Sequence, residues 1–345
     1  MTSPQARHTY RKKDHTPRTR RANRPAYAAV DLGTNNCRLL VAEPSVKGFR
    51  VIDSFSRVVR LGEGVAATGR LSERAIDRTI DALRICAAKM RRADVIRVRN
   101  VATAACREAE NCDLFVERAL TETGLDFEII SASEEARLAL NSCTPLFDRD
   151  IPGAIVFDIG GGSTEIVCRA GRDAPIGVLS LPLGVVNLCE RYGGDRIAGD
   201  DFTRMVEEAT ELLAAFEKDQ RILPQIAAGQ MQMVGSSGTV TTLASVHLGL
   251  RKYVRSRIDG ATMRFDDLLR IGRMLAGMSR DERAAIACIG AERADLVVGG
   301  VAILEAIIGM WPVGRMRIAD RGLREGILLG LMAQDGHRVG ARVIH

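Results

Sequence analysis

The sequence contains few aromatic residues: one Trp, four Tyr and nine Phe among 345 residues. Most of its apolar side chains are therefore aliphatic, which suits buried parallel strands covered by helices better than an aromatic-rich β-sandwich. A chain of this length is long for one hydrophobic core, so we expect two domains. Apolar strand-like segments alternate with segments of helical period, which indicates the α/β class with largely parallel sheets.

Several kinds of site are excluded by what is missing. There is no G-x-x-x-x-G-K-[ST] motif, so this is not a Walker-type nucleotide hydrolase. Four of the five histidines lie near the chain ends, which argues against a histidine metal cluster or a Ser-His-Asp triad. The eight cysteines include no C-x-x-C pair and are expected to be free thiols in a reducing compartment. Without a recognisable signal peptide or membrane-length apolar stretch, we expect a cytoplasmic protein that binds no membrane.

Positive charge is concentrated at the N-terminus. Residues 1–25 contain eight Lys or Arg and one acid, a net charge of +7, whereas the whole chain carries +6 and the remainder therefore −1. This segment has almost no apolar residues, and we expect a disordered basic tail. A solvated extension is its simplest interpretation, and contact with nucleic acid or capture of a polyanionic substrate are the alternatives. No specific nucleic-acid partner is expected.

One motif occurs twice. An apolar strand, an Asp, an apolar residue, a Gly and a hydroxyl residue follow one another in residues 30–34 and, with extra glycines, in residues 157–164. A second strand-like segment follows each copy. The repeat predicts two domains of like topology, residues 26–148 and 149–345, joined near a segment rich in Pro, Gly and Asp.

Glycine-rich loops after strands suit phosphate because backbone N–H groups can approach the ligand without a Cβ in the way. A single copy is better explained as a tight turn, but two copies and a third loop at 235–239 favour phosphate binding. Asp31 and Asp158, at the strand ends, are interpreted as ligands of a divalent cation that bridges to phosphate oxygens. The predicted phosphate-binding residues are Gly33, Thr34, Asn35 and Asn36, then Gly160, Gly161, Gly162 and Ser163, then Gly235, Ser237, Gly238 and Thr239.

Attack of water on a phosphoanhydride needs a carboxylate to position the water and cations to neutralise developing charge. Glu134 and Glu135 open a helix, predicted to start after Ser133, that directly follows a strand, and Arg107 follows another strand. The carboxyl ends of strands are where α/β sheets collect ligands. Acids in a first helical turn also complement the helix dipole, and spacing alone favours that simpler interpretation.

Five ordered motifs resemble the exopolyphosphatase / guanosine-pentaphosphate phosphohydrolase family of the actin-like ATPase superfold. The resemblance covers about residues 27–333, and G-L-R-E-G at 322–326 matches the end of the family's second domain. The motifs are V-D-L-G-T-N at 30–35, A-T-A-A-C-R-E-A at 102–109, S-A-S-E-E-A-R-L at 131–138, F-D-I-G-G-G-S-T-E at 157–165 and G-S-S-G-T at 235–239.

The resemblance implies two ribonuclease-H-like domains with an active site in the interdomain cleft. It implies a homodimer that uses Mg²⁺ (or Mn²⁺) to hydrolyse the terminal phosphate of inorganic polyphosphate or the 5′ γ-phosphate of guanosine pentaphosphate. Glu135 matches the water-activating residue of the family, and Arg107 matches a residue that contacts phosphate. Asp158 and Glu165 match the metal-associated acids.

The sequence departs from the family pattern at two positions. Asn36 stands where Ser is usual, and Ala132 stands where Gly commonly precedes the two glutamates. Long family members carry a C-terminal helical HD-type domain for which this chain has no room, so we expect a shorter substrate channel. We expect an exopolyphosphatase. The alternatives are a guanosine-pentaphosphate hydrolase, a kinase or ATPase of the same superfold, and a non-catalytic nucleotide or phosphate sensor.

Overall fold

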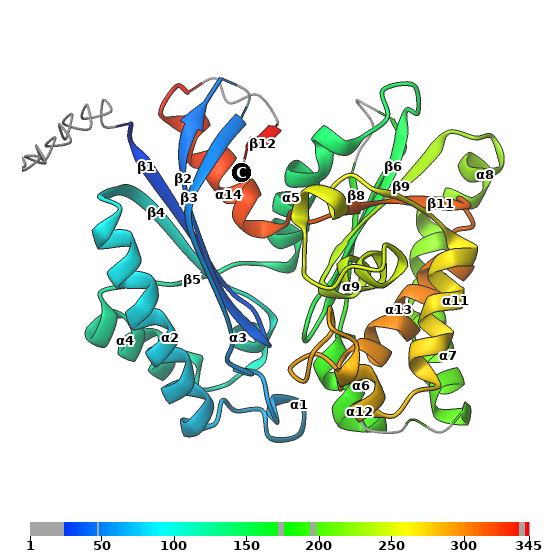
Figure 1. The fold of residues 1–345 in the computed structure, drawn as a ribbon, viewed down its shortest axis with the longest axis horizontal. Helices are drawn as coiled ribbons and strands as arrows, with labels where there is room; N and C mark the ends of the chain where they lie inside the picture. Colours follow the sequence, from blue (N-terminus) through cyan, green and yellow to red (C-terminus); the bar gives the residue numbers. More distant parts are fainter. Residues whose placement is uncertain are drawn as a thin grey trace, which may run out of the picture.

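The structure is a computed structural model that describes residues 24–46, 48–171, 176–193, 197, 199–337 and 342–344. It contains two six-stranded mixed sheets, each with its own helices, standing side by side (Figure 1). Most of the predicted basic tail, residues 1–23, lies outside the described residues.

The first sheet has the strand order β12-β3-β2-β1-β4-β5. Strands β1 to β3 form an antiparallel meander, and β4 and β5 continue the sheet parallel to β1. Two helices, α2 (Glu73–Arg92) and α4 (Cys112–Thr123), pack on one face. Ser72 caps α2 by accepting from the backbone N–H of Ala75. The strands are β1 (Ala26–Leu32), β2 (Asn36–Ser45), β3 (Gly48–Val58), β4 (Val95–Ala102), β5 (Glu128–Ile129) and β12 (Arg342–Ile344).

The second sheet repeats this path with the order β10-β11-β9-β6-β7-β8. Here β6, β7 and β8 form the antiparallel meander, and β9 and β11 run parallel to β6. The repeat seen in the sequence is therefore a repeat of topology. The strands are β6 (Gly153–Ile159), β7 (Thr164–Arg169), β8 (Ile176–Leu181), β9 (Met231–Ser237), β10 (Thr262–Arg264) and β11 (Arg315–Ala319).

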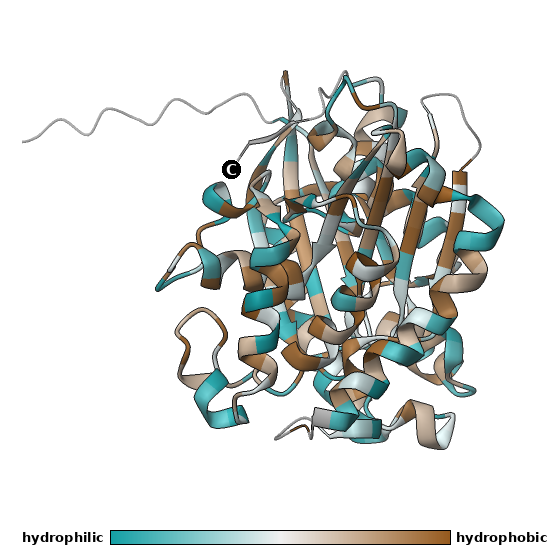
Figure 2. Cartoon of the chain, turned by 90° about the vertical axis from the view of Figure 1, so that its right-hand side faces the viewer, coloured by the Kyte–Doolittle hydropathy of each residue, from teal (hydrophilic) through white to brown (hydrophobic). Residues whose placement is uncertain are grey.

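Helix α13 (Val297–Met310) runs through the core of the second domain. Its apolar side chains are buried in the largest hydrophobic cluster, so the segment is core. Figure 2 shows apolar residues concentrated in the strands of this domain and polar residues frequent on its helices. The other helices of this half are α6 (Val185–Tyr192), α7 (Gly199–Gln220), α8 (Ile222–Ala227), α9 (Gly238–His247), α10 (Arg255–Ile258), α11 (Phe265–Ala276) and α12 (Arg280–Ala285).

Two helices cross between the domains. Helix α5 (Ala132–Cys143) packs on β6 and β7 of the second sheet, whereas α14 (Leu323–Gln334) packs on β1 and β2 of the first. They touch where a Cβ on Gly326 would lie 2.4 Å from the carbonyl oxygen of Leu138. Strand β12 also joins the first sheet, beside β3. Helix α14 and strand β12, placed in the second domain by the sequence-based boundary, therefore belong to the first sheet, because the apolar face of α14 is covered there.

One local boundary differs from the prediction. Helix α5 begins at Ala132 rather than after Ser133, because the Ser131 side chain accepts from the backbone N–H of Glu134 and caps the helix. Short helical turns occur at α1 (Val65–Thr68) and α3 (Ala104–Glu108). All eight cysteines are free thiols. No helix in the described part of the chain has both the length and the apolar character needed to cross a membrane.

Candidate active site

A cavity of about 130 Å³ lies between the two sheets, and both domains line it. Its walls are the turns after β1 and β6 and the start of α9, where the three predicted glycine-rich loops are located. The cavity brings together these predicted residues: Asp31, Gly33, Thr34, Asn35, Asn36, Glu135, Asp158, Gly160, Gly161, Gly162, Ser163, Glu165, Gly238 and Thr239. Segments far apart in the sequence thus form one site.

The first two loops touch each other across the cleft. A Cβ on Gly162 would lie 2.7 Å from Thr34 Oγ1, and a Cβ on Gly161 would lie 3.1 Å from the backbone nitrogen of Asn35. Glycine is needed here for close approach, since no positive φ is involved at either position. The loops stand in a closed arrangement.

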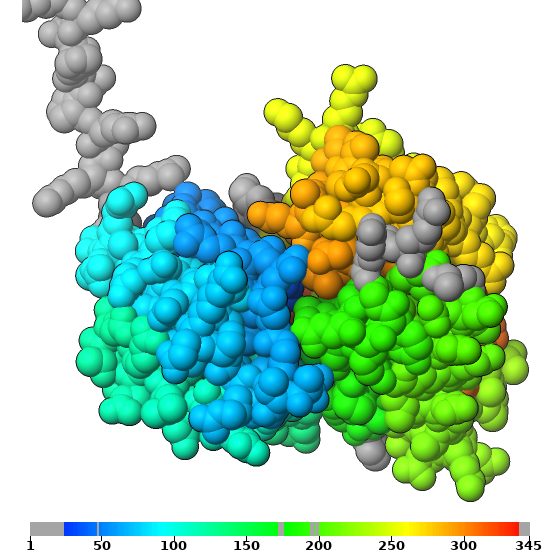
Figure 3. Space-filling model, turned by 90° about the horizontal axis from the view of Figure 1, so that it is seen from below, coloured from blue at the N-terminus to red at the C-terminus, as the bar shows by residue number. Residues whose placement is uncertain are grey.

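Two further contacts join the two domains. Arg60 forms an ion pair with Asp295 at 3.0 Å, and the backbone N–H of Gly64 donates to Glu190 Oε1 at 3.0 Å. Seen from below, the blue surface of the first domain abuts the green and orange surfaces of the second (Figure 3). The backbone nitrogens of Val59 and Arg60 both donate to the carbonyl of Asn35, so this segment is tied to the first loop.

Three carboxyl groups at the site have raised pKa values. Burial is the largest cause for each, and it raises the pKa of Glu135 to about 8 and those of Asp158 and Glu165 to about 7. Neighbouring carboxylates add to this: Glu165 raises the pKa of Glu135, and Asp158 raises that of Glu165. Burial likewise raises the pKa of Asp31. These acids are therefore harder to ionise than ordinary carboxyl groups.

Arg107 lies between two of these carboxylates. Its Nη1 donates to Glu135 Oε2 at 2.7 Å and to the carbonyl oxygen of Ile130 at 3.1 Å. Its Nη2 is 3.7 Å from Glu165 Oε1. Arg107 does not line the cavity directly, but it pairs with the carboxylate that does. The neighbouring Glu134 points elsewhere and pairs with Arg99.

The acids fit a hard divalent cation. Asp158 and Glu165 are paired in register on β6 and β7, and carboxylate oxygens are the ligands that Mg²⁺ prefers. Within the described residues, no three acidic, histidine or cysteine side chains gather closely enough to enclose a metal by themselves. A cation here would therefore share its coordination between one or two carboxylates, water and phosphate oxygens, as Mg²⁺ commonly does.

Three predicted phosphate ligands have other roles in the structure. The Ser163 hydroxyl donates to Glu165 Oε1 at 2.7 Å. The Ser237 hydroxyl accepts from the backbone N–H of Val240 and caps α9, although the residue lines a neighbouring cavity. Gly235 lies inside β9, where a Cβ would be 2.7 Å from Phe157 Cζ, and it lines neither cavity. A residue in a glycine-rich segment therefore does not always face the cavity.

The structure also reveals site residues that the sequence reasoning missed. A second cavity of about 190 Å³ adjoins the first and shares Arg38 and Arg293 with it. Neither arginine forms an ion pair or side-chain hydrogen bond with any residue that the structure describes. Loss of hydration and then Arg38 lower the pKa of Arg293, as expected for two like charges that face each other. Arg324 and Tyr253 line the same cavity. The sequence could have indicated Arg38 as a site residue only through the pairing of β2 with β1, which places it opposite Asp31. No local sequence pattern identifies Arg293 as a site residue.

Comparison with known proteins identifies the family. The sequence profile of the Ppx/GppA phosphatase family matches residues 40–335, which is most of the chain. The chain belongs to this family. The predicted family and the predicted class of enzyme, a hydrolase of phosphoanhydride bonds, are both confirmed.

Relatives within the Ppx/GppA family extend over nearly the whole chain. Exopolyphosphatase 2 of Mycobacterium tuberculosis is 31% identical over 322 residues, which cover 88% of this chain and 98% of that protein. Guanosine-5'-triphosphate,3'-diphosphate pyrophosphatase of Aeromonas salmonicida is 30% identical over 321 residues, covering 93% of this chain and 62% of that longer protein.

Solved Ppx/GppA structures confirm the predicted fold. The Aquifex aeolicus family member superposes with a TM-score of 0.73 at 28% identity, covering 91% of this chain and 99% of that one. An exopolyphosphatase from Cytophaga hutchinsonii gives a TM-score of 0.80 at 26% identity, with the same coverage. The fold is the predicted pair of ribonuclease-H-like domains of the actin-like superfold.

Proposed function

We propose that this protein is an exopolyphosphatase that releases the terminal phosphate of inorganic polyphosphate, with Glu135 activating the attacking water. One observation carries the proposal: Glu135 faces the cavity formed by the glycine-rich loops while Arg107 holds it at 2.7 Å. Its raised pKa of about 8 makes it a stronger base than an ordinary carboxylate. The match to an exopolyphosphatase over 98% of that relative supports polyphosphate as the substrate.

The chain's own groups have distinct tasks in this mechanism. Backbone N–H groups of the loops at 33–36 and 160–163 bind the terminal phosphate. Glu135 orients water and takes its proton as the new O–P bond forms. The anhydride P–O bond breaks, and the shortened chain leaves as an anion. Because the transition state is loose, positioning and electrostatics dominate, and the base contributes about 10²–10⁴-fold.

Charge neutralisation comes from two sides. Arg107 lies between Glu135 and Glu165, where it can offset charge on the transferred phosphoryl group. Asp158 and Glu165 are the residues that would hold Mg²⁺, which supplies further neutralisation when it is bound together with phosphate oxygens. Arg38 and Arg293, in the adjoining cavity, are placed to bind the phosphates that follow the terminal one.

Guanosine pentaphosphate is the second candidate substrate. Tyr253 borders the adjoining cavity beside Arg293, and an aromatic ring next to cations can accommodate a nucleobase as well as phosphate. The similarity to the Aeromonas salmonicida enzyme supports this alternative.

The test is phosphate release with Mg²⁺ from long-chain polyphosphate, guanosine pentaphosphate and ATP. We expect release from polyphosphate by the wild type and loss of about 10²–10⁴-fold in turnover for Glu135→Gln, with substrate binding retained. Glu134→Gln is the matched control, because the adjacent carboxylate is paired with Arg99 instead. Near-normal turnover in a folded Glu135→Gln protein would refute the role of Glu135. A preference for guanosine pentaphosphate would replace the substrate and leave the mechanism intact.

A further inference from the structure

A cationic segment lies at the rim of the second cavity. Residues 251–257 read R-K-Y-V-R-S-R, and residues 220–258 contain no acid. Tyr253 of this segment lines the second cavity, as Arg293 does. Figure 3 shows the yellow part of the chain, around residue 250, projecting beside the junction of the two domains.

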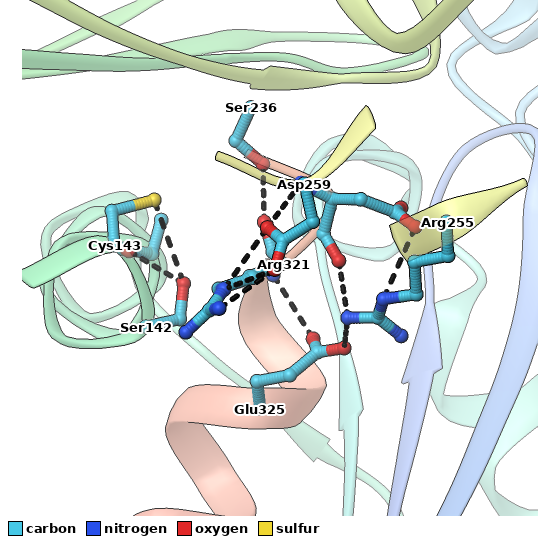
Figure 4. Close-up of polar contacts among 10 residues, drawn as sticks. Ser142, Cys143, Ser236, Arg255, Asp259, Arg321 and Glu325 are labelled. Atoms are coloured by element: carbon cyan, nitrogen blue, oxygen red, sulfur yellow. Dashed lines mark hydrogen bonds and ion pairs between the residues drawn. The ribbon is translucent and has the colours of Figure 1, made fainter. Parts of the chain in front are cut away.

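The segment is held in place by its one inward-pointing arginine. Arg255 Nη2 donates to Glu325 Oε1 at 3.0 Å, and its Nε lies 3.2 Å from Asp320 Oδ2 (Figure 4). Glu325 is fully buried and also accepts from the backbone N–H of Gly322, so this anchor is fixed to the start of α14. The Tyr253 hydroxyl is hydrogen-bonded to Asp320 as well.

The remaining three cations of the segment point outward. Arg251, Lys252 and Arg257 are exposed, and none forms an ion pair or a side-chain hydrogen bond within the described chain. Arg255 and Arg321 nearby are, by contrast, neutralised by Glu325 and Asp259. Asp320 and Glu325 are therefore paired with Arg255, and Asp259 with Arg321, so the outer cations can bind an external anion.

The basic segment and the cations of the cavity are linked through Tyr253. Arg38, Arg293 and Arg324 line the second cavity together with Asp31, Asp158 and Asp320, and Tyr253 of the segment lines it too. A linear polyanion that reaches the first cavity with its end would pass the inner arginines and emerge beside the outer cations. Its negative charge would reduce the repulsion among these cations.

We propose that Arg251, Lys252 and Arg257 form an outer subsite that binds the distal part of a long inorganic polyphosphate chain. The proposal rests on the proposed function and extends it to chain length. The subsite contributes to affinity for long chains and has nothing to contact on a short one. It makes the preference for chain length depend on salt, because its cations are exposed.

The test compares two triple variants of equal charge change. In one, Arg251, Lys252 and Arg257 are changed to Gln; in the control, Arg74, Arg91 and Arg92, exposed on α2, are changed to Gln. We expect the first to raise the ratio of KM for long-chain polyphosphate to KM for tripolyphosphate by about tenfold at low salt. The control leaves this ratio within about twofold. Equal ratios for both variants and the wild type would overturn the proposal.

A binding assay separates this proposal from the proposed function. Affinity for fluorescently labelled long-chain polyphosphate is measured without turnover, in the Glu135→Gln background, with and without the triple change. Weaker binding on the triple change supports the subsite even if the wild type hydrolyses no polyphosphate. A single-stranded RNA of matched charge is the competing probe. Loss of RNA binding with unchanged polyphosphate binding would assign the segment to nucleic acid and overturn the proposal.

Discussion

The two glycine-rich loops differ in the residue that lies opposite their aspartate. In the first domain Asp31 is paired in register with Arg38, and in the second Asp158 is paired with Glu165. The strands are otherwise arranged alike. Burial raises the pKa of Asp31 as well as those of Asp158 and Glu165, which reach about 7, and Arg38 opposes the effect of burial at both aspartates.

This difference shows how a repeated fold can make an asymmetric site. At the same register position, the first side of the cleft carries Arg38 and the second side carries Glu165. The first side is then suited to substrate phosphates and the second to a divalent cation. These separate roles can be tested by changing one register partner at a time.

The largest effect is expected from exchanging the two register partners for neutral groups. Glu165→Gln removes a candidate metal ligand, and we expect kcat to fall by about 10²–10³-fold. Arg38→Gln removes a substrate contact, and we expect KM to rise by about tenfold with a smaller change in kcat. Steady-state kinetics with Mg²⁺ measure both. Similar kcat losses in the two variants would mean that the two sides of the cleft do not have separate roles.

A smaller effect is expected from adding a methyl group to each loop. Gly162→Ala would push a Cβ to 2.7 Å from Thr34 Oγ1, whereas a Cβ on Gly33 would be 3.8 Å from its nearest neighbour, the carbonyl oxygen of Asn36. Overpacking of this kind costs about 1–3 kcal/mol, so we expect kcat/KM to fall about tenfold in Gly162→Ala. Gly33→Ala lacks this overlap, so we expect its loss of kcat/KM to be smaller. The closed contact would be irrelevant to turnover if both variants behaved alike.

The smallest effect concerns stability and pH. Asp158 and Glu165 have folded-state pKa values of about 7, above their ordinary values of 3.8 and 4.5. Their contribution to stability is therefore full below about pH 4 and is lost as the pH rises through about 7. We expect the Tm of Glu165→Gln, relative to wild type, to rise between pH 5 and pH 8.

Mg²⁺ provides the complementary measurement for the same carboxylates. A cation that binds the ionised acids stabilises the folded state by mass action, so Mg²⁺ should raise the wild-type Tm by roughly 2 °C or more at pH 8. The increase should be smaller at pH 5 and smaller in Glu165→Gln. Differential scanning calorimetry with and without EDTA measures both. An Mg²⁺ effect that is the same at both pH values would contradict the assignment of these acids.

Sequence reasoning succeeded where the signal is local. The strand ends at Asp31 and Asp158 are as predicted. Glu135 was placed in the first turn of a helix after a strand, and it lies there. Hydrophobic period and capping are properties of neighbouring residues, which is why they can be read along the chain.

Sequence reasoning was less successful where the contacts of a residue are set by tertiary packing. Gly235 belongs to a glycine-rich segment that was predicted to bind phosphate, but Phe157 fills the space beside it in the sheet. This packing depends on which strand lies alongside, and no pattern within the segment itself specifies that. Ser163 lines the cavity, and its hydroxyl also donates to Glu165 of the same motif, so its phosphate role stays a prediction.

The sequence by itself determined the family, the α/β class, the repeat of two domains and most of the residues that line the cavity. Only the tertiary structure decided that α14 returns to the first sheet, that Arg38 and Arg293 meet across the cleft, and that Arg107 is paired with Glu135. The physical reason is distance along the chain. Turns and helices are set by contacts a few residues apart, whereas these pairings arise when two separate sheets pack together and leave charges facing one cleft.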